Sequence, residues 1–148
     1  MEKKLEEQSL EQFYGIVSKQ LPLKRVITPL TKKLLDVFDA PGSDIVITKF
    51  PEFTCLCPKT NQPDFGKVTI SYIPGKVCVE LKSLKYYLNS FRNEGHFHEE
   101  VCNIIQRDLR GALAPDWLVV QIKFNFRGGL YTTVFSGDID EDRSILNS

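Results

Sequence analysis

A thiol, a lysine and a carboxyl group lie close together in the sequence, at Cys57, Lys59 and Asp64. A cysteine is a strong nucleophile only as its thiolate, and a nearby cation lowers the pKa of a thiol by favouring that charged form. A carboxyl group a few residues away could act as general acid toward an intermediate bound to the sulfur. The same spacing also fits a buried thiol beside a turn aspartate, so both interpretations stay open.

These residues belong to a stretch, 51–65, that contains the three prolines Pro51, Pro58 and Pro63. Because proline fixes φ and has no amide donor, the stretch is not expected to be a helix or a central strand. Loops held by regular elements often carry binding or catalytic side chains. The sequence therefore predicts a rigid loop between two strands.

A basic cluster marks the start of an expected helix, where Lys82, Ser83 and Lys85 follow Glu80. The first amides of a helix lack partners inside the helix, and with lysine side chains they would bind an anion such as a cofactor phosphate. The cluster could also be a solvated basic face. Glu80 could instead accept hydrogen bonds from a ligand.

A second helix is expected from about residue 96, with His98 and Glu99 in its first turn. The helix dipole favours a carboxylate at that position, so Glu99 could be a capping charge. It could also accept two hydrogen bonds from a guanine-like edge, with His98 as a further polar contact. Arg127 and Gly128 form either a hairpin turn or a phosphate contact.

Hydrophobic periodicity predicts the elements that must position these groups. Alternation indicates strands, and apolar residues at i, i+3, i+4 and i+7 indicate a helix that starts with Ser83 as its N-cap. The expected elements are strands 44–50, 67–73, 118–126 and 130–135 and helices 83–92 and 96–113. Their order predicts an α+β domain, an antiparallel four-stranded sheet with two helices on one face. Because free sheet edges tend to be paired, edge-to-edge assembly into a ring is expected.

Length and composition fit one domain with a single core, since the chain has 148 residues and a formal net charge of zero. That balance argues against binding to a membrane surface or to nucleic acid, so no direct tRNA binding is expected. We expect residues 1–43 to form an arm that packs on the domain or on a neighbouring subunit. Residues 44–135 would form the domain, and residues 136–148 a tail. Without an apolar spanning or signal segment, we expect a cytoplasmic protein.

The cysteine pattern does not indicate a disulfide framework, and reduced thiols are expected in the cytosol. The four cysteines are Cys55, Cys57, Cys78 and Cys102. Cys55-x-Cys57 and His96-x-His98 lack the paired Cys-x-x-Cys spacing of structural zinc sites. We therefore expect no bound metal.

Five motifs occur in order between about residues 44 and 131: 52–65, 80–87, 91–93, 97–99 and 126–129. Together they resemble the QueF family, the NADPH-dependent 7-cyano-7-deazaguanine reductases of queuosine biosynthesis, a tRNA-modification pathway. The Cys57-Pro58-Lys59-Thr60 block joined to the later Glu-Leu-Lys-Ser block is the most specific part of the resemblance. The chain looks like the short, single-module form, which implies the tunnelling fold and a decamer of two stacked pentamers with ligand sites between subunits.

The resemblance also implies roles for individual residues. Cys57 would be the nucleophile that forms a thioimide with the nitrile, Asp64 would donate the proton, and NADPH would be the co-substrate. The deazapurine substrate would be held by Val79, Glu80, Leu81, His98 and Glu99. The region that binds NADPH would contain Lys82, Ser83, Lys85, Arg127 and Gly128.

Two other functions remain as alternatives. One is a non-catalytic purine- or pterin-binding protein of the same fold, against which the presence of both Cys57 and Asp64 argues. The other is a zinc-dependent enzyme similar to a cyclohydrolase. Such an enzyme needs a set of metal ligands, and His96, His98 and Cys102 are only loosely arranged for one.

Overall fold

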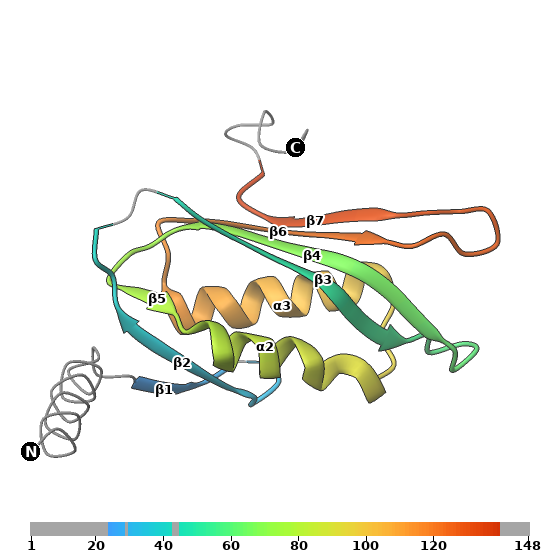
Figure 1. Ribbon diagram of the computed structural model, residues 1–148, viewed down its shortest axis with the longest axis horizontal. Helices are drawn as coiled ribbons and strands as arrows, with labels where there is room; N and C mark the ends of the chain where they lie inside the picture. Colours follow the sequence, from blue (N-terminus) through green and yellow to red (C-terminus); the bar gives the residue numbers. More distant parts are fainter. Residues whose placement is uncertain (1–23, 29, 43–44, 140–148) are drawn as a thin grey trace, which may run out of the picture.

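The computed structural model describes residues 24–28, 30–42 and 45–139 (Figure 1). The main elements are β3 (Val46–Leu56), β4 (Pro63–Ile73), α2 (Leu81–Asn89), the 3-10 helix η1 (Ser90–Asn93), α3 (His98–Leu113), β6 (Trp117–Phe124) and β7 (Thr133–Gly137). The strands form an antiparallel sheet in the order β3-β4-β6-β7, and both α-helices lie on one of its faces. The structure confirms the predicted α+β class, the four-stranded sheet and the position of the helices.

The hydrophobic core lies between this sheet and the helices. In β4 the predicted alternation is confirmed, because Val68, Ile70 and Tyr72 are all buried. The predicted helical stripe is buried as well, with Leu84, Tyr87 and Leu88 in α2 and Phe91 in η1. Phe97 and Phe126 fall within the predicted helix 96–113 and strand 118–126, but both are exposed and lie just outside α3 and β6.

The stretch 51–65 is not the long loop that its prolines predicted, because only residues 57–62 connect β3 to β4. Pro51 fits inside β3 because this strand lies at the edge of the sheet and has a β-bulge at that point. Pro63 is the first residue of β4, where a missing amide donor is tolerated. Two long strands therefore hold a short loop that carries Cys57.

Other element boundaries moved by a few residues. The first helix begins at Leu81 rather than at residue 83, and the last strand begins at Thr133 rather than at residue 130. The turn between β6 and β7 is longer than predicted, and Arg127 and Leu130 close it with two backbone hydrogen bonds of 2.7 and 3.1 Å. Arg127 and Gly128 thus do lie in a hairpin turn, with Gly128 at a φ of 58°.

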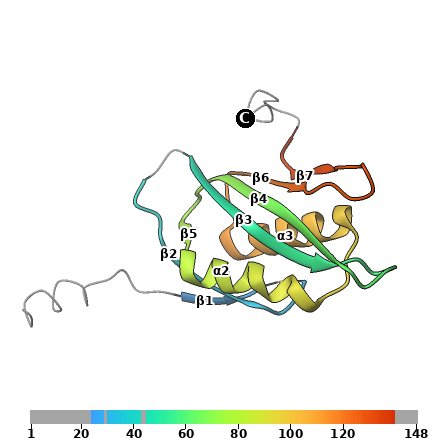
Figure 2. The same ribbon diagram turned by 45° about the vertical axis from the view of Figure 1, so that its right-hand side comes forward.

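A second, smaller sheet comes partly from the segment expected to be an arm. β1 (Lys24–Ile27) pairs with β2 (Leu34–Asp39), and β2 also pairs with β5 (Val77–Val79). Figures 1 and 2 show β2 running beside α2 and β1 running beside β2. Leu35 and Val37 of β2 are buried in the common core. Residues 1–23 and 140–148 lie outside the described residues, and the division into arm, domain and tail stays a prediction.

A buried carboxylate fastens the β1–β2 hairpin to the helices. Asp108 of α3 is fully buried and accepts hydrogen bonds from the Leu30 amide (2.9 Å), the Thr31 hydroxyl (2.8 Å) and the Tyr87 hydroxyl (2.6 Å). A buried carboxylate is stable only when such donors replace its water. The hairpin is therefore an integral part of the packed structure.

Candidate active site

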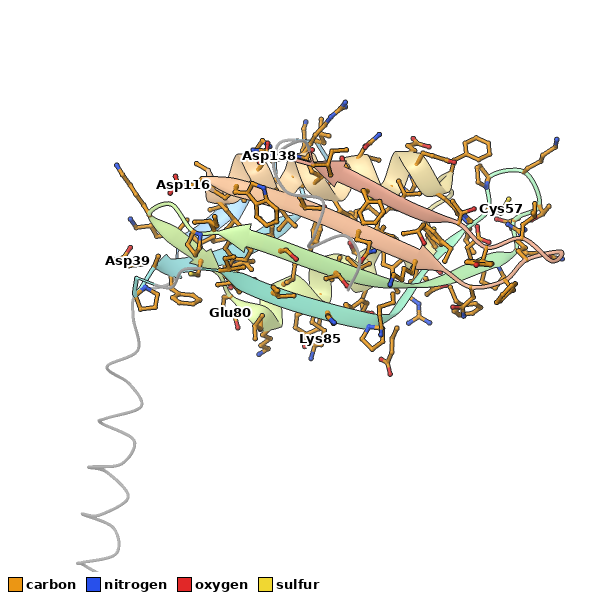
Figure 3. The ribbon with its side chains drawn as sticks, turned by 90° about the horizontal axis from the view of Figure 1, so that it is seen from above. Asp39, Cys57, Glu80, Lys85, Asp116 and Asp138 are labelled. Carbon is orange, nitrogen blue, oxygen red and sulfur yellow. The ribbon has the colours of Figure 1, made fainter. Side chains whose placement is uncertain are left out.

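A cavity of about 190 Å³ opens beside Cys57 at one end of the sheet (Figure 3). Its walls come from the 57–62 loop, the start of β4, the first turn of α3 and the β6–β7 turn. The residues that line it are Cys57, Pro58, Asp64, His96, Phe97, His98, Glu99 and Arg127. Five residues that the sequence singled out for chemistry or binding are thus brought together here: Cys57, Asp64, His98, Glu99 and Arg127.

The 57–62 loop places Cys57 through backbone hydrogen bonds. The Cys57 amide donates to the Gln62 carbonyl and the Asn61 amide donates to the Cys57 carbonyl, both at 2.8 Å. Asn61 adopts a left-handed φ of 57°, which asparagine tolerates better than most residues. The segment before α3 closes the other side, since the backbone of Leu56 exchanges hydrogen bonds with Glu94 and His96. Cys57 therefore lies between the hairpin loop and the start of α3.

The Cys57 thiol is activated by donors rather than by a lysine side chain. The hydroxyl of Thr60, the amides of Thr60 and Lys59 and the Arg127 guanidinium lower the pKa of Cys57 to about 6. Lys59 was predicted to act through its ammonium group, but it acts through its backbone amide. These donors favour the thiolate because they stabilise the charged form by hydrogen bonding.

The pKa values of two other thiols, Cys55 and Cys102, shift in the opposite direction from that of Cys57. Burial, with a contribution from Asp64, raises the pKa of Cys55 to about 11, and burial raises the pKa of Cys102 to about 12. Buried thiols of this kind pack as small apolar side chains and react slowly. Of these three cysteines, Cys57 is the one equipped for nucleophilic attack.

Asp64 is held at the cavity by two cationic or polar partners. Its side chain is only 6% exposed, and Arg127 Nη1 donates to Asp64 Oδ1 at 2.7 Å. The second carboxyl oxygen lies 3.3 Å from His98 Nε2. The His98 ring is stacked on Phe124, with centroids 3.6 Å apart and planes 4° apart. Asp64 is therefore held by Arg127 and His98, of which His98 is itself held by stacking on Phe124.

The remaining wall of the cavity combines an apolar ring with a carboxylate. Phe97 is 57% exposed, and Glu99 is exposed in the first turn of α3. An exposed aromatic ring beside an acceptor can stack on a flat heterocycle while the carboxylate accepts its N–H groups. This arrangement fits a planar ligand that carries adjacent hydrogen-bond donors.

The second predicted group lies elsewhere in the chain. A cavity of about 340 Å³ near the start of α2 is lined by Arg25, Leu34, Asp36, Glu80, Lys82, Ser83 and Tyr86. It shares no lining residue with the Cys57 cavity, and Figure 3 labels Glu80 and Lys85 well away from Cys57. Within one chain, the structure does not bring Val79, Glu80 and Leu81 to the cavity beside Cys57.

The expected N-cap of α2 was wrong. The N-cap is Glu80, not Ser83, because the Glu80 carboxylate accepts from the amides of Lys82 (2.8 Å) and Ser83 (2.7 Å). Those amides are therefore not free to bind an anion. The Ser83 hydroxyl is also engaged, since it donates to the Glu80 carbonyl at 2.8 Å and accepts from the Asp36 amide at 2.9 Å.

Sequence reasoning gave no site role to two residues at or beside the cavity. Thr60 accepts a hydrogen bond from Arg127 Nη2 at 2.7 Å. His96 was considered only as a zinc ligand, and its Nε2 lies 3.1 Å from Glu94, which in turn pairs with Lys33 at 2.6 Å. Thr60 is three positions from Cys57 and His96 is two positions from His98, and this closeness in sequence was the only indication that they belong to the site.

Neither a metal centre nor a spanning helix is found in the described part of the chain. Among residues 24–28, 30–42 and 45–139, no three His, Cys, Asp or Glu side chains are grouped so as to hold a metal ion. The zinc-dependent alternative therefore has no ligand set among those residues. No helix within those ranges has the length and apolar character needed to cross a bilayer.

The chain was compared with known families and proteins. The family model of QueF-like proteins matches residues 63–143. NADPH-dependent 7-cyano-7-deazaguanine reductases from Thiobacillus denitrificans and Nitrosospira multiformis are 53% and 59% identical over 105 residues, with 69% of this chain and 76% of each relative covered. A crystal structure of the archaeosine synthase QueF-Like in the apo form superposes with a TM-score of 0.62 at 22% identity, over 66% of this chain and 95% of that one. That likeness supports the fold alone, whereas the sequence matches show that the chain belongs to the family of QueF-like proteins.

Proposed function

We propose that this chain reduces the nitrile of 7-cyano-7-deazaguanine to an aminomethyl group with NADPH, as a step of queuosine biosynthesis. The observation that carries the proposal is the meeting of an activated thiol, Cys57, and a fixed carboxyl group, Asp64, at one cavity. The relatives that share half or more of the aligned residues are named for this activity. The exposed Phe97 ring and the Glu99 carboxylate suit a flat deazapurine with donor groups.

In the proposed mechanism the Cys57 thiolate attacks the nitrile carbon, and a carbon–sulfur bond forms as one carbon–nitrogen π bond breaks. Asp64 gives a proton to the nitrogen, which leaves a thioimide on the enzyme. Covalent capture turns a poor electrophile into a carbon–nitrogen double bond. Two molecules of NADPH would each supply one hydride, the first to the thioimide carbon and the second to the imine that remains after the thiolate leaves. A second proton on nitrogen completes the amine and balances the reaction.

The NADPH-binding residues are part of the same proposal. Lys82, Lys85 and Arg127 are cationic, and Lys82 and Lys85 are exposed, which suits a co-substrate that carries phosphates. Gly128 next to Arg127 leaves open space for a close approach. Glu80, Leu81 and Val79 would contact the deazaguanine ring from a neighbouring subunit.

Assembly into a ring, as a decamer of two stacked pentamers, completes the proposal. It is supported by the separation of the Glu80 segment from Cys57 within one chain. It is also supported by the positions of β3 and β7, which end the sheet without a further strand in the described chain. All four cysteines are free thiols, which suits a cytoplasmic location.

The intact mass of the protein after mixing with 7-cyano-7-deazaguanine, without NADPH, tests the proposal. We expect a mass gain equal to one substrate in the unmodified protein and none in Cys57→Ala. Cys55→Ala is the matched control and should keep the adduct, because its thiol is buried and protonated. No adduct at any pH between 6 and 9 would contradict the proposal and leave a non-catalytic purine- or pterin-binding protein.

A further inference from the structure

The hydroxyl oxygen of Thr60 has two neighbouring donors, although the residue lies in an exposed loop. Arg127 Nη2 donates to Thr60 Oγ1 at 2.7 Å, and the Gln62 amide lies 3.4 Å from the same oxygen. A hydroxyl group has two acceptor positions and one proton to donate. With both acceptor positions engaged, the hydroxyl proton is left to point at a third group.

The shape of the loop makes the Cys57 sulfur the candidate for that third group. The Asn61 amide donates to the Cys57 carbonyl, which folds residues 57–60 into a tight turn and brings Thr60 back beside Cys57. In agreement, the Thr60 hydroxyl makes the largest contribution to the lowered pKa of Cys57. A thiolate is an acceptor without protons, so a hydroxyl donor both stabilises it and limits its rotation.

We propose that Thr60 is a positioning residue for the nucleophile: its hydroxyl, held by Arg127, donates a hydrogen bond to the Cys57 thiolate and aims it into the cavity. This inference rests on the proposed function for its effect on turnover, but not for its effect on the thiol.

The planar guanidinium of Arg127 explains why the two reacting groups keep a fixed relation. Its Nη1 donates to Asp64 and its Nη2 to Thr60, each at 2.7 Å. A guanidinium is a rigid fork, so the position of one partner constrains the position of the other. Through Thr60, the loop that carries the thiol is thereby tied to the carboxyl group that would donate the proton.

The test compares Thr60→Val, which removes the hydroxyl at nearly constant shape, with Thr60→Ser, which keeps it. The reaction of Cys57 with iodoacetamide is followed from pH 5 to pH 10 by mass spectrometry, without substrate. Thr60→Val should raise the apparent pKa of Cys57 by at least ~1, and Thr60→Ser should restore it. Thr69→Val, in β4 and outside the cavity lining, is the matched control and should change nothing.

The rate of adduct formation with 7-cyano-7-deazaguanine supplies the second readout. Thr60→Val should slow the reaction roughly tenfold at pH 6.5 but much less at pH 9, where the thiol ionises without help. A purely structural role would slow it equally at both values. If Thr60→Val does not fold, Thr60→Ala is measured in its place.

An unchanged alkylation profile in folded Thr60→Val would overturn the inference, as would a shift that Thr60→Ser fails to reverse. The two proposals fail separately. A Thr60-dependent thiol pKa without a nitrile adduct would support the positioning role and contradict the reductase. A nitrile adduct that forms with the same pH dependence in Thr60→Val and in the unmodified protein would support the reductase and contradict the positioning role.

Discussion

The Cys57 cavity and the start of α2 hold similar residue types but arrange them differently. At the cavity, side chains from a hairpin loop, a strand, a helix and a turn converge, and their donors act on the Cys57 sulfur and on Asp64. At the start of α2, the Glu80 carboxylate accepts hydrogen bonds from two backbone amides, and the Ser83 hydroxyl donates to the Glu80 carbonyl. The first arrangement leaves a reactive atom facing a cavity, whereas the second stabilises a helix.

The contrast shows that a motif rich in polar residues does not reveal whether its groups face a ligand or each other. In a single chain, the start of α2 has its own structural role, and a ligand would have to compete with the cap or use the side chains that stay exposed. The following experiments would break or sharpen this distinction, beginning with the largest expected effect.

Asp64→Asn should lower the rate of adduct formation by ~10²–10⁴-fold, which is the usual loss when a general acid is removed. Asparagine keeps the size and one acceptor oxygen for Arg127, so the protein should stay folded. Single-turnover kinetics with 7-cyano-7-deazaguanine give the rate. The matched control is Asp116→Asn, an exposed aspartate that Figure 3 labels far from Cys57, and it should not alter the rate. Unchanged kinetics in Asp64→Asn would remove this residue as the proton donor.

Alkylation at pH 7 should select Cys57 over Cys55 by at least ~10²-fold. The pKa of Cys57 is about 6 and that of Cys55 about 11, so at pH 7 most of the first thiol and almost none of the second is ionised. Because only the thiolate reacts, labelling of Cys57 should rise as the pH passes through about 6 and should then level off. Peptide mapping after a short exposure to iodoacetamide measures the ratio, and equal labelling would contradict the claim of a specific activated thiol.

Local sequence patterns predicted the helices and strands well, but they did not predict which strands and side chains pair across long distances in the sequence. Alternation located the buried faces of β4 and β6, and helical spacing located α2. The full lengths of β3 and β4 were not predicted, because Pro51 and Pro63 were interpreted as loop residues. The strands accommodate these prolines because Pro51 lies at a bulge in an edge strand and Pro63 is the first residue of β4. None of those features is visible before the strands are paired.

The candidate site was predictable only as far as neighbours in sequence define it. The sequence singled out Cys57, Asp64 and the first turn of α3, and these line one cavity. The partners of Arg127 are more than sixty residues away, so no spacing rule reveals them. The contact of Asp108 with Thr31 was missed for the same reason. Electrostatic activation of Cys57 depends on such distant donors and on amide directions, which only the folded loop defines.

Glu99→Gln should weaken binding of the deazapurine by ~10–100-fold and leave NADPH binding nearly unchanged, because a charged acceptor is lost from one ligand only. Isothermal titration of each ligand into Cys57→Ala avoids the covalent step. The matched control is Glu100→Gln, since Glu100 follows on the same turn but does not line the cavity. Equal losses for both ligands would contradict the assignment of Glu99 to the substrate.

Glu80→Ala should lower the free energy of unfolding by about 1 kcal/mol, the typical value of an N-cap side chain. The two amides that the carboxylate now satisfies would be left to water. Urea denaturation at fixed protein concentration measures the change, with Glu52→Ala as a control on an exposed part of β3. If stability were unchanged while deazapurine binding was lost, Glu80 would serve a ligand in the assembled protein rather than the helix. The distinction between the two regions would then hold for the single chain only.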